Sequence, residues 1–197
     1  MSSGFQPPAE LAAALREVLL DPAQAAGLDV PGRIDAAVLV PLFLRDDRLH
    51  VVLTRRTSGL RSHAGEVSFP GGRQDDDETD LRLTALREAQ EEIGLDPGAV
   101  ELVGALAPTP TVVSNYAVYP FVGLIAPGTR WTLSAREVDE VLEPSIDELR
   151  AGFGRRSMVR RGIPFRTDVY ALDGAVVWGA TARMLGDLLE RLERAGL

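Results

Sequence analysis

The chain has 197 residues, 45% of them hydrophobic, and a formal net charge of −8 at pH 7. This length supports one full core, and the acidic charge argues against broad binding to nucleic acid or to an anionic membrane, since both need a basic surface. No apolar run reaches membrane-spanning length, and the absence of cysteine excludes disulfides, thiolate metal sites and cysteine nucleophiles. The first residues show no secretory signal pattern. We therefore expect a soluble, cytoplasmic protein.

The N-terminal part is expected to be a helix followed by a linker. Residues 8–20 carry apolar side chains at helical spacing. Residues 21–33 are rich in Pro, Gly, Asp and Ala, a composition typical of a linker. We therefore divide the chain into an N-terminal helix and linker, residues 1–32, and a main domain, residues 33–197.

Two strands are predicted at the start of the main domain. Residues 36–44 form a continuous apolar run, which is typical of a buried strand, although Pro41 within this run favours an edge or a bulge. Residues 45–48 read Arg-Asp-Asp-Arg and predict a hairpin turn into a second strand at residues 49–54.

A basic segment, residues 53–72, leads from that strand into a glycine turn. Arg56 and Arg61 lie along it, and the planar fork of arginine suits phosphate because it donates two parallel hydrogen bonds. For any single arginine, a solvated surface loop is the simpler interpretation. His63 in its neutral form could act as a base, but a lone loop histidine more often only forms hydrogen bonds.

Three glutamates are expected on one face of the helix that follows. Glu88 and Glu92 are four residues apart and Glu88 and Glu91 three apart, so these side chains are neighbours on a helix surface. Like charges at those spacings destabilise an isolated helix, whereas a divalent cation such as Mg²⁺ takes carboxylate oxygens as ligands. A solvated acidic face is the alternative in a chain of this charge.

The ends and the buried face of this helix are also predicted. Asp77 or Thr79 is expected as the N-cap, and Gly94 as a left-handed C-cap. In front of the helix, Gly71 and Gly72 form a turn in which the backbone can approach a ligand closely. The face opposite the glutamates is expected to be buried, and it carries Leu86, Ala89, Gln90 and Ile93.

Further strands and one short helix are predicted beyond this point. Residues 100–106 and 118–125 read as strands, with a stiff Pro-containing loop at residues 108–111 between them. A conspicuously acidic segment, residues 134–144, follows as a strand or a loop edge. Ser145 could then cap a helix that extends to Ala151.

The C-terminal part opens with a local excess of positive charge. The arginines of residues 152–166 are Arg155, Arg156, Arg160, Arg161 and Arg166. In an acidic chain this segment could meet the phosphates of a nucleotide, or it could be a surface loop. Residues 169–178 predict a hairpin around Asp173-Gly174, and residues 179–194 a terminal helix with its leucines facing inward.

The run from Arg87 to Gly94, Arg-Glu-Ala-Gln-Glu-Glu-Ile-Gly, resembles the Nudix box, in which a glycine, a glutamate and the pattern Arg-Glu-x-x-Glu-Glu-x-Gly follow one another. One spacing departs from the family pattern. Glu78 lies one residue too far from Arg87, and the expected glutamate position, counted back from Arg87, holds Thr79. Asp77 is an alternative to Glu78 in that role.

The basic segment resembles a second motif, which precedes the box in the coenzyme A pyrophosphatase branch of the Nudix superfamily. The matching residues are Leu53, Thr54, Arg56, Leu60, Arg61, His63, Gly65, Val67 and Phe69. Near the C-terminus, the sequence Trp-Gly-Ala-Thr from Trp178 to Thr181 is similar to the Trp-Gly-x-Thr element that opens the last helix in this branch. The resemblance covers roughly residues 33–194.

The resemblance implies an α/β fold, the Nudix-type α/β/α sandwich with a mixed β-sheet. It implies hydrolysis of the pyrophosphate bond of a nucleoside diphosphate derivative, with coenzyme A or an acyl-CoA preferred, giving adenosine 3′,5′-bisphosphate and (acyl)phosphopantetheine. A pyrophosphatase for ADP-ribose or another dinucleotide, and a non-catalytic nucleotide-binding module, are the alternatives. The expected partner is thus a small nucleotide and neither nucleic acid nor a membrane. Many relatives form dimers, so a homodimer is also considered, although the sequence identifies no interface.

The resemblance also assigns roles to residues of the site. Mg²⁺ or Mn²⁺ would be held by Glu88 and Glu92 with the help of Glu91. Glu78, Glu91 or Glu137 would accept the proton of the attacking water, and the sequence does not choose among them. Glu137 is one of these candidates because a glutamate of the acidic segment often reaches the metal cluster in relatives. Arg87 is assigned an ion pair that ties the helix to the preceding loop. The residues expected to bind substrate are Arg56, Arg61, His63, Gly71 and Gly72.

Overall fold

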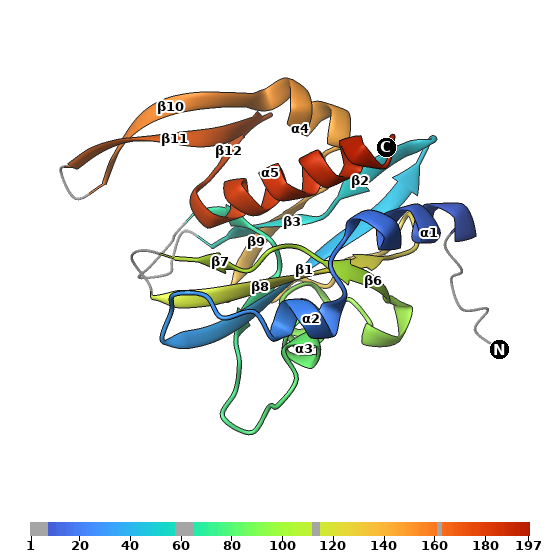
Figure 1. Ribbon diagram of the computed structural model, residues 1–197. Coiled ribbons are helices and arrows are strands. Elements are labelled where there is room, and N and C mark those ends of the chain that lie inside the picture. Colours follow the sequence, from blue (N-terminus) through green and yellow to red (C-terminus); the bar gives the residue numbers. More distant parts are fainter. Residues whose placement is uncertain (1–7, 58–64, 112–114, 161–162) are drawn as a thin grey trace.

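The computed structural model describes residues 8–57, 65–111, 115–160 and 163–197 (Figure 1). Its central sheet has the strand order β2-β1-β8-β6, with β5 paired to β1 and β7 paired to β8. The parallel pairing of β1 with β8, beside antiparallel neighbours, makes the sheet mixed. These strands are β1 Ile34–Arg45, β2 Arg48–Val51, β5 Gly71–Arg73, β6 Glu101–Ala105, β7 Thr109–Pro110 and β8 Tyr116–Leu124.

Strand β1 is apolar throughout because both of its faces are covered. Alternate side chains of a strand point to opposite faces, and here Val38 and Val40 join one apolar cluster while Leu39 and Phe43 join another. The predicted strand and hairpin turn are confirmed, with Asp46 and Asp47 at positive φ between β1 and β2.

Pro41 lies inside this central strand, so the expectation of an edge or a bulge is wrong. The backbone of Pro41 faces away from β8, since its carbonyl accepts a hydrogen bond from the N–H of Val52. On that side β1 pairs with β5 up to Val38 and with β2 from Leu42, which leaves Pro41 in the gap between two partner strands. The missing N–H of proline therefore removes no bond from the β1–β8 ladder.

Helices cover both faces of the central sheet, which confirms the predicted α/β/α sandwich (Figure 1). Helices α1 and α5 pack into one apolar cluster, and α2 and α3 into the other. Figure 1 shows α1 and α5 above the sheet and α3 below it. The helices are α1 Ala9–Val18, α2 Pro22–Ala26, α3 Leu81–Ile93, α4 Ile146–Gly152 and α5 Gly179–Arg194, with a 3₁₀ turn at Pro97–Ala99.

The N-terminal segment is built into the same core as the sheet. Leu11 and Leu15 of α1 are buried in one cluster with Leu185 and Leu188 of α5. The expected linker also contains a helix, α2, because Asp21 caps it by accepting hydrogen bonds from two backbone N–H groups and proline is favoured at a first helical position. The division of the chain at residue 32 remains a prediction.

Two smaller sheets flank the central one. The first contains β3 Leu53–Arg56, β4 Val67–Ser68 and β9 Val138–Leu142, in the order β4-β3-β9. The expected strand at residues 49–54 is thus split at Val52, since β2 belongs to the central sheet and β3 to this one. The stiff loop expected at residues 108–111 likewise includes the short strand β7.

The second small sheet forms an arm. Strands β10 Phe153–Arg160, β11 Ile163–Leu172 and β12 Ala175–Trp178 pair in sequence order, and the β10–β11 hairpin extends from the body of the protein (Figure 1). The surface-loop interpretation of residues 152–166 is therefore wrong. The predicted hairpin into β12, the terminal helix α5 and the Ser145-capped helix α4 are confirmed.

Candidate active site

The helix that carries the glutamates, α3, begins later than predicted. Asp80 is the N-cap, and its side chain accepts a hydrogen bond from the N–H of Arg82 at 2.9 Å. The prediction of Asp77 or Thr79 is wrong because a turn, closed by the N–H of Glu78 and the carbonyl of Asp75, occupies this part of the chain. Gly94, with φ of 71°, ends the helix as predicted.

The buried face of α3 differs in part from the predicted one. Ala85, Ala89 and Ile93 are fully buried against the sheet, as expected of residues four apart on one helix face. Gln90 is exposed, so its assignment to the buried face is wrong. Glu92 is buried in its place, with 4% of its side chain exposed. A carboxylate therefore lies where an apolar side chain would normally pack.

Glu92 has few partners for a buried carboxylate. The N–H of Gly71 donates a hydrogen bond to its Oε2 at 3.2 Å, and Nη1 of Arg56 lies 3.9 Å from its Oε1. Burial raises the pKa of Glu92 to about 8, and the charges of Glu88 and Glu137 act in the same direction. This carboxylate thus needs a further positive charge to stay ionised at neutral pH.

Glu88 lies beside the glycine turn. Burial raises its pKa, against the opposing effect of Arg87, and the charges of Glu91 and Glu137 raise it further. A Cβ atom placed on Gly72 would lie 2.5 Å from the carboxylate carbon of Glu88. The turn therefore runs directly against this carboxylate, which would have to shift to make room for a larger residue at this position. The close approach of a ligand to the turn, expected from the sequence, stays a prediction.

Arg87 connects α3 to the loop in front of it. Its Nε donates to Oε1 of Glu78 at 2.8 Å, and its Nη1 to Oε1 of Glu88 at 2.9 Å. Glu78 also accepts a hydrogen bond from the hydroxyl of Thr84 at 2.7 Å, and these contacts, with that of Arg87 the strongest, lower the pKa of Glu78 to about 2. The helix and the loop are thus held together by ionised groups.

The two other candidate carboxylates approach the cluster from different sides. Glu91 is 57% exposed and reaches Arg87 only at 3.3 Å. Glu137 precedes β9, where its carbonyl accepts the N–H of Thr57 at 3.0 Å. The acidic segment lies against α3, since the N–H of Ser134 donates to the carbonyl of Glu92 at 2.9 Å, and the charge of Glu137 raises the pKa of both Glu88 and Glu92. A role of Glu137 at a metal ion, which the resemblance implied, stays a prediction.

The carboxylates fit a hard divalent cation by their chemistry. All are oxygen donors, and the charges of buried Glu92 and half-buried Glu88 oppose each other, a repulsion that a dication relieves. In the described ranges, however, no three acidic or histidine side chains converge closely enough to hold a metal ion as they stand. Glu88 and Glu92 lie on the inner side of α3, beside the segment that contains Glu137, whereas Glu91 is at the surface.

The expected substrate-binding residues are only partly described. Arg56 ends β3 and lies at Glu92, and its buried Nε has no hydrogen-bond partner among the residues that the structure describes. Gly71 and Gly72 begin β5, directly beside α3. Arg61 and His63 lie outside the described residues, so their roles stay predictions.

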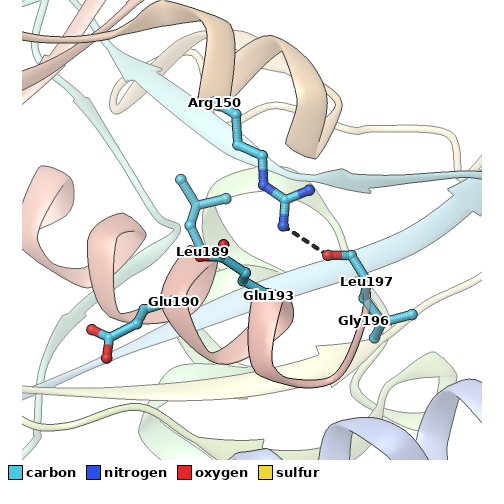
Figure 2. A pocket seen from close by; sticks show the side chains of 6 residues that line it. All are labelled: Arg150, Leu189, Glu190, Glu193, Gly196 and Leu197. Atoms are coloured by element: carbon cyan, nitrogen blue, oxygen red, sulfur yellow. Dashed lines mark hydrogen bonds between the residues drawn. The ribbon is translucent and has the colours of Figure 1, made fainter.

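Sequence reasoning missed Thr84, which is fully buried and donates to Glu78. No sequence pattern indicated this contact, because Glu78 belongs to the loop in front of the N-cap Asp80. A cavity of about 530 Å³ lies elsewhere, between α4 and the end of α5, where Arg150 donates to the carbonyl of Leu197 at 2.7 Å (Figure 2). None of the candidate site residues that the structure describes lines that cavity.

Comparisons with known proteins show the family of this chain. A sequence model of the NUDIX domain matches residues 33–161. The chain belongs to the Nudix hydrolase family. The uncharacterized Nudix hydrolase NudL of Salmonella paratyphi B is 41% identical over 155 residues, which cover 78% of this chain and 80% of that protein.

Two solved structures show the same fold at low sequence identity. The NUDIX domain of Shewanella oneidensis NrtR, complexed with ADP ribose, has a TM-score of 0.56 at 15% identity and covers 87% of this chain and 96% of its own. The MutT protein of Methanosarcina mazei has a TM-score of 0.53 at 19% identity, and the match covers 86% of this chain and 99% of that protein. These likenesses concern the fold alone.

Family membership makes this Nudix protein an enzyme, a hydrolase of nucleoside diphosphate derivatives. Nudix hydrolases generally use divalent metal ions such as Mg²⁺ or Mn²⁺. Within the described ranges, no helix combines the length and the apolar character that crossing a membrane requires.

Proposed function

We propose that this Nudix hydrolase cleaves the pyrophosphate bond of coenzyme A or an acyl-CoA, giving adenosine 3′,5′-bisphosphate and (acyl)phosphopantetheine. One observation carries the proposal. The two ends of the segment that resembles the coenzyme A motif pair as β3 and β4, with Thr54 opposite Ser68 and Arg55 opposite Val67. Both ends then reach the carboxylate cluster, through Arg56 at one end and the N–H of Gly71 at the other.

In this proposal Glu88 and Glu92 are the principal ligands of Mg²⁺ or Mn²⁺, and Glu91 assists them. When bound, such an ion polarises phosphoryl oxygens, neutralises developing charge and lowers the pKa of the attacking water. Burial of Glu92 supports its assignment, because an apolar environment strengthens its attraction for a cation. Glu91 reaches only Arg87 in the described contacts, which suits a supporting role.

We assign the role of general base, which accepts the proton of the attacking water, to Glu91 or Glu137. Glu78 is less suited to this task, because Arg87 and Thr84 occupy both of its oxygens and lower its pKa to about 2. We therefore assign Glu78 and Arg87 to positioning, as the pair that fixes α3 against the loop. Glu137 is half-buried and its charge raises the pKa of both Glu88 and Glu92, which supports its candidacy as the base.

Recognition of the substrate is assigned to the glycine turn and the basic segment. Arg56 has a buried nitrogen without a protein partner in the described part of the chain, and a phosphate oxygen would satisfy it. Gly71 and Gly72 allow the pyrophosphate to approach the backbone. Arg61 and His63 are proposed to contact the same substrate.

The proposal is tested by offering coenzyme A, ADP-ribose and a diadenosine polyphosphate separately, each with Mg²⁺, with Mn²⁺ and with EDTA. We expect metal-dependent hydrolysis with the highest kcat/KM for coenzyme A or an acyl-CoA. Preference for ADP-ribose or the dinucleotide would agree with hydrolase activity but would reject coenzyme A as the preferred substrate. Equal rates with and without metal would reject the proposed role of the carboxylate cluster.

A further inference from the structure

A cavity of about 390 Å³ lies where the β10–β11 hairpin meets the start of α5. Its lining consists of Arg155, Arg166, Thr167, Asp168, Gly179, Ala182 and Arg183. Three of these side chains are positively charged and one is negatively charged, in a chain whose net charge is −8. The cavity is therefore a local positive region on an acidic protein.

Strand register explains why the arginines gather there. Arg155 is opposite Asp168, and Ser157 is opposite Arg166, so that these side chains share one face of the hairpin. Arg156 comes next along β10, points to the other face and does not line the cavity. The third arginine, Arg183, comes from the first turns of α5.

The positive charge is only partly neutralised by the protein. Nε of Arg155 donates to Oδ1 of Asp168 at 2.7 Å. Arg183 donates to the carbonyl of Pro110 at 2.6 Å, a neutral partner that orients the guanidinium and leaves its charge intact. The side chain of Arg166 makes no hydrogen bond or ion pair with any residue in the described ranges.

The start of α5 adds donors to the same wall. Gly179, the first residue of this helix, lines the cavity, and the N-cap Trp178 makes no side-chain hydrogen bond to the first turn. The backbone N–H groups at a helix start and the positive end of the helix dipole favour an anion. Arginine side chains and helix N–H groups thus converge on one space.

We propose that this cavity is a second binding site of the protein, for a phosphate dianion carried either by inorganic phosphate or by a phosphate monoester. Guanidinium groups bind phosphate through paired hydrogen bonds, which suits an anion with several oxygens. The volume is in the range of small-molecule pockets, so an organic body attached to the phosphate fits as well. The site is separate from the glutamate cluster, because α5 and α3 pack on opposite faces of the central sheet.

The test is isothermal titration of the full chain in EDTA, with inorganic phosphate and, separately, with adenosine 5′-monophosphate. We expect binding of one phosphate group per chain that weakens as salt is added. Arg166→Gln and Arg183→Gln should each weaken it about tenfold, since each removes a charge-assisted contact. The matched control, Arg156→Gln, removes the same charge from the other hairpin face and should leave the affinity unchanged.

Tighter binding of the monophosphate identifies a monoester as the ligand, and equal affinities identify inorganic phosphate. Absence of binding for both probes, or an equal loss in Arg156→Gln and Arg166→Gln, overturns the proposal. Asp168→Asn provides a test of the opposite sign, because removing the negative charge of the cavity should raise the affinity, whereas a lower affinity contradicts the charge argument. EDTA keeps these results independent of turnover at the glutamate cluster.

Discussion

Arg87 holds Glu78 with two guanidinium nitrogens, Nε at 2.8 Å from Oε1 and Nη2 at 3.2 Å from Oε2. This bidentate pair joins the helix of the glutamate cluster to the loop in front of it. A third nitrogen, Nη1, contacts Glu88 at 2.9 Å, so the same side chain also orients a proposed metal ligand. The position of the cluster therefore depends on a residue that is not itself a ligand.

The first prediction concerns this pair. Arg87→Lys cannot reproduce the planar fork, and we expect it to lower the free energy of unfolding by about 1.5–3 kcal/mol, the usual range for a hydrogen bond to a charged group. A double-mutant cycle with Glu78→Gln, followed by urea denaturation in EDTA, should show a coupling energy of about 1–2 kcal/mol. The same cycle with Arg73→Lys and Asp76→Asn is the matched control, because the Arg73–Asp76 pair is exposed. A coupling energy between Arg87 and Glu78 no larger than that of the exposed pair would show that Arg87 is not structural.

The second prediction separates catalysis from stability at the buried carboxylates. Glu92→Gln and Glu88→Gln keep the side-chain shape and remove a charge, and we expect kcat to fall by about a hundredfold or more with Mg²⁺. In EDTA, Glu92→Gln should not lower the melting temperature, since the buried site already opposes ionisation of this carboxyl group. Glu190→Gln on α5 is the exposed control. Normal turnover in both variants would contradict the proposed metal site.

The third prediction tests the close approach of the glycine turn. Gly72→Ala places a methyl group 2.5 Å from the carboxylate of Glu88, so either the turn or the carboxylate must move. Displacement of a reacting group by about 1 Å can lower a rate by about a hundredfold, and we expect a loss of kcat of about tenfold or more. Gly154→Ala is the matched control, because an added Cβ there meets no atom within 4 Å. Equal activity of both variants would contradict the observed packing.

The fourth prediction concerns pH and helix α4. Glu148 accepts hydrogen bonds from the N–H and the hydroxyl of Ser145, and these contacts lower its pKa below the ordinary value of 4.5. A carboxylate with a lower pKa in the folded state stabilises the protein above pH 4.5, and this contribution disappears as the pH falls through the folded-state pKa.

Wild type should therefore be more stable than Glu148→Gln at pH 7, by about 0.5 kcal/mol for an exposed helix-capping charge. The difference should close in acid, because protonated glutamate and glutamine are then nearly equivalent. Urea denaturation between pH 7 and pH 3 measures both values. A difference that grows as the pH falls would have the wrong sign for a capping carboxylate.

Much of the fold follows from local sequence patterns. The terminal helix α5 spans the predicted residues 179–194, because its leucine spacing and its start after Trp178 are local features. The hairpin β10–β11 was not predicted as such, since a run of arginines and glycines has no alternating apolar pattern. The prediction that Pro41 lies at an edge or a bulge was wrong for a related reason. Whether proline fits a strand depends on the partner opposite its N–H, which is a tertiary property.

The candidate site likewise combines features that follow from local sequence with features that depend on tertiary structure. The neighbourhood of Glu88 and Glu92 follows from helix geometry alone, and burial of Glu92 does not, because it depends on how α3 rotates against the sheet. Glu78 departs from the usual spacing, and only the turn that begins at Asp75 shows how the additional residue is accommodated before the helix. Glu137 is 45 positions after Glu92 in the sequence, so its approach to the helix is set by the path of the chain into β9.

Hydrolysis of coenzyme A at the carboxylate cluster is best tested by mass spectrometry of the products that the wild type and Glu92→Gln form from coenzyme A with Mg²⁺. We expect adenosine 3′,5′-bisphosphate and phosphopantetheine from the wild type, and about a hundredfold less of both from the variant. Equal product from the two proteins would contradict the carboxylate site. Intact coenzyme A after incubation with an active wild-type enzyme, shown by cleavage of ADP-ribose, would contradict the substrate.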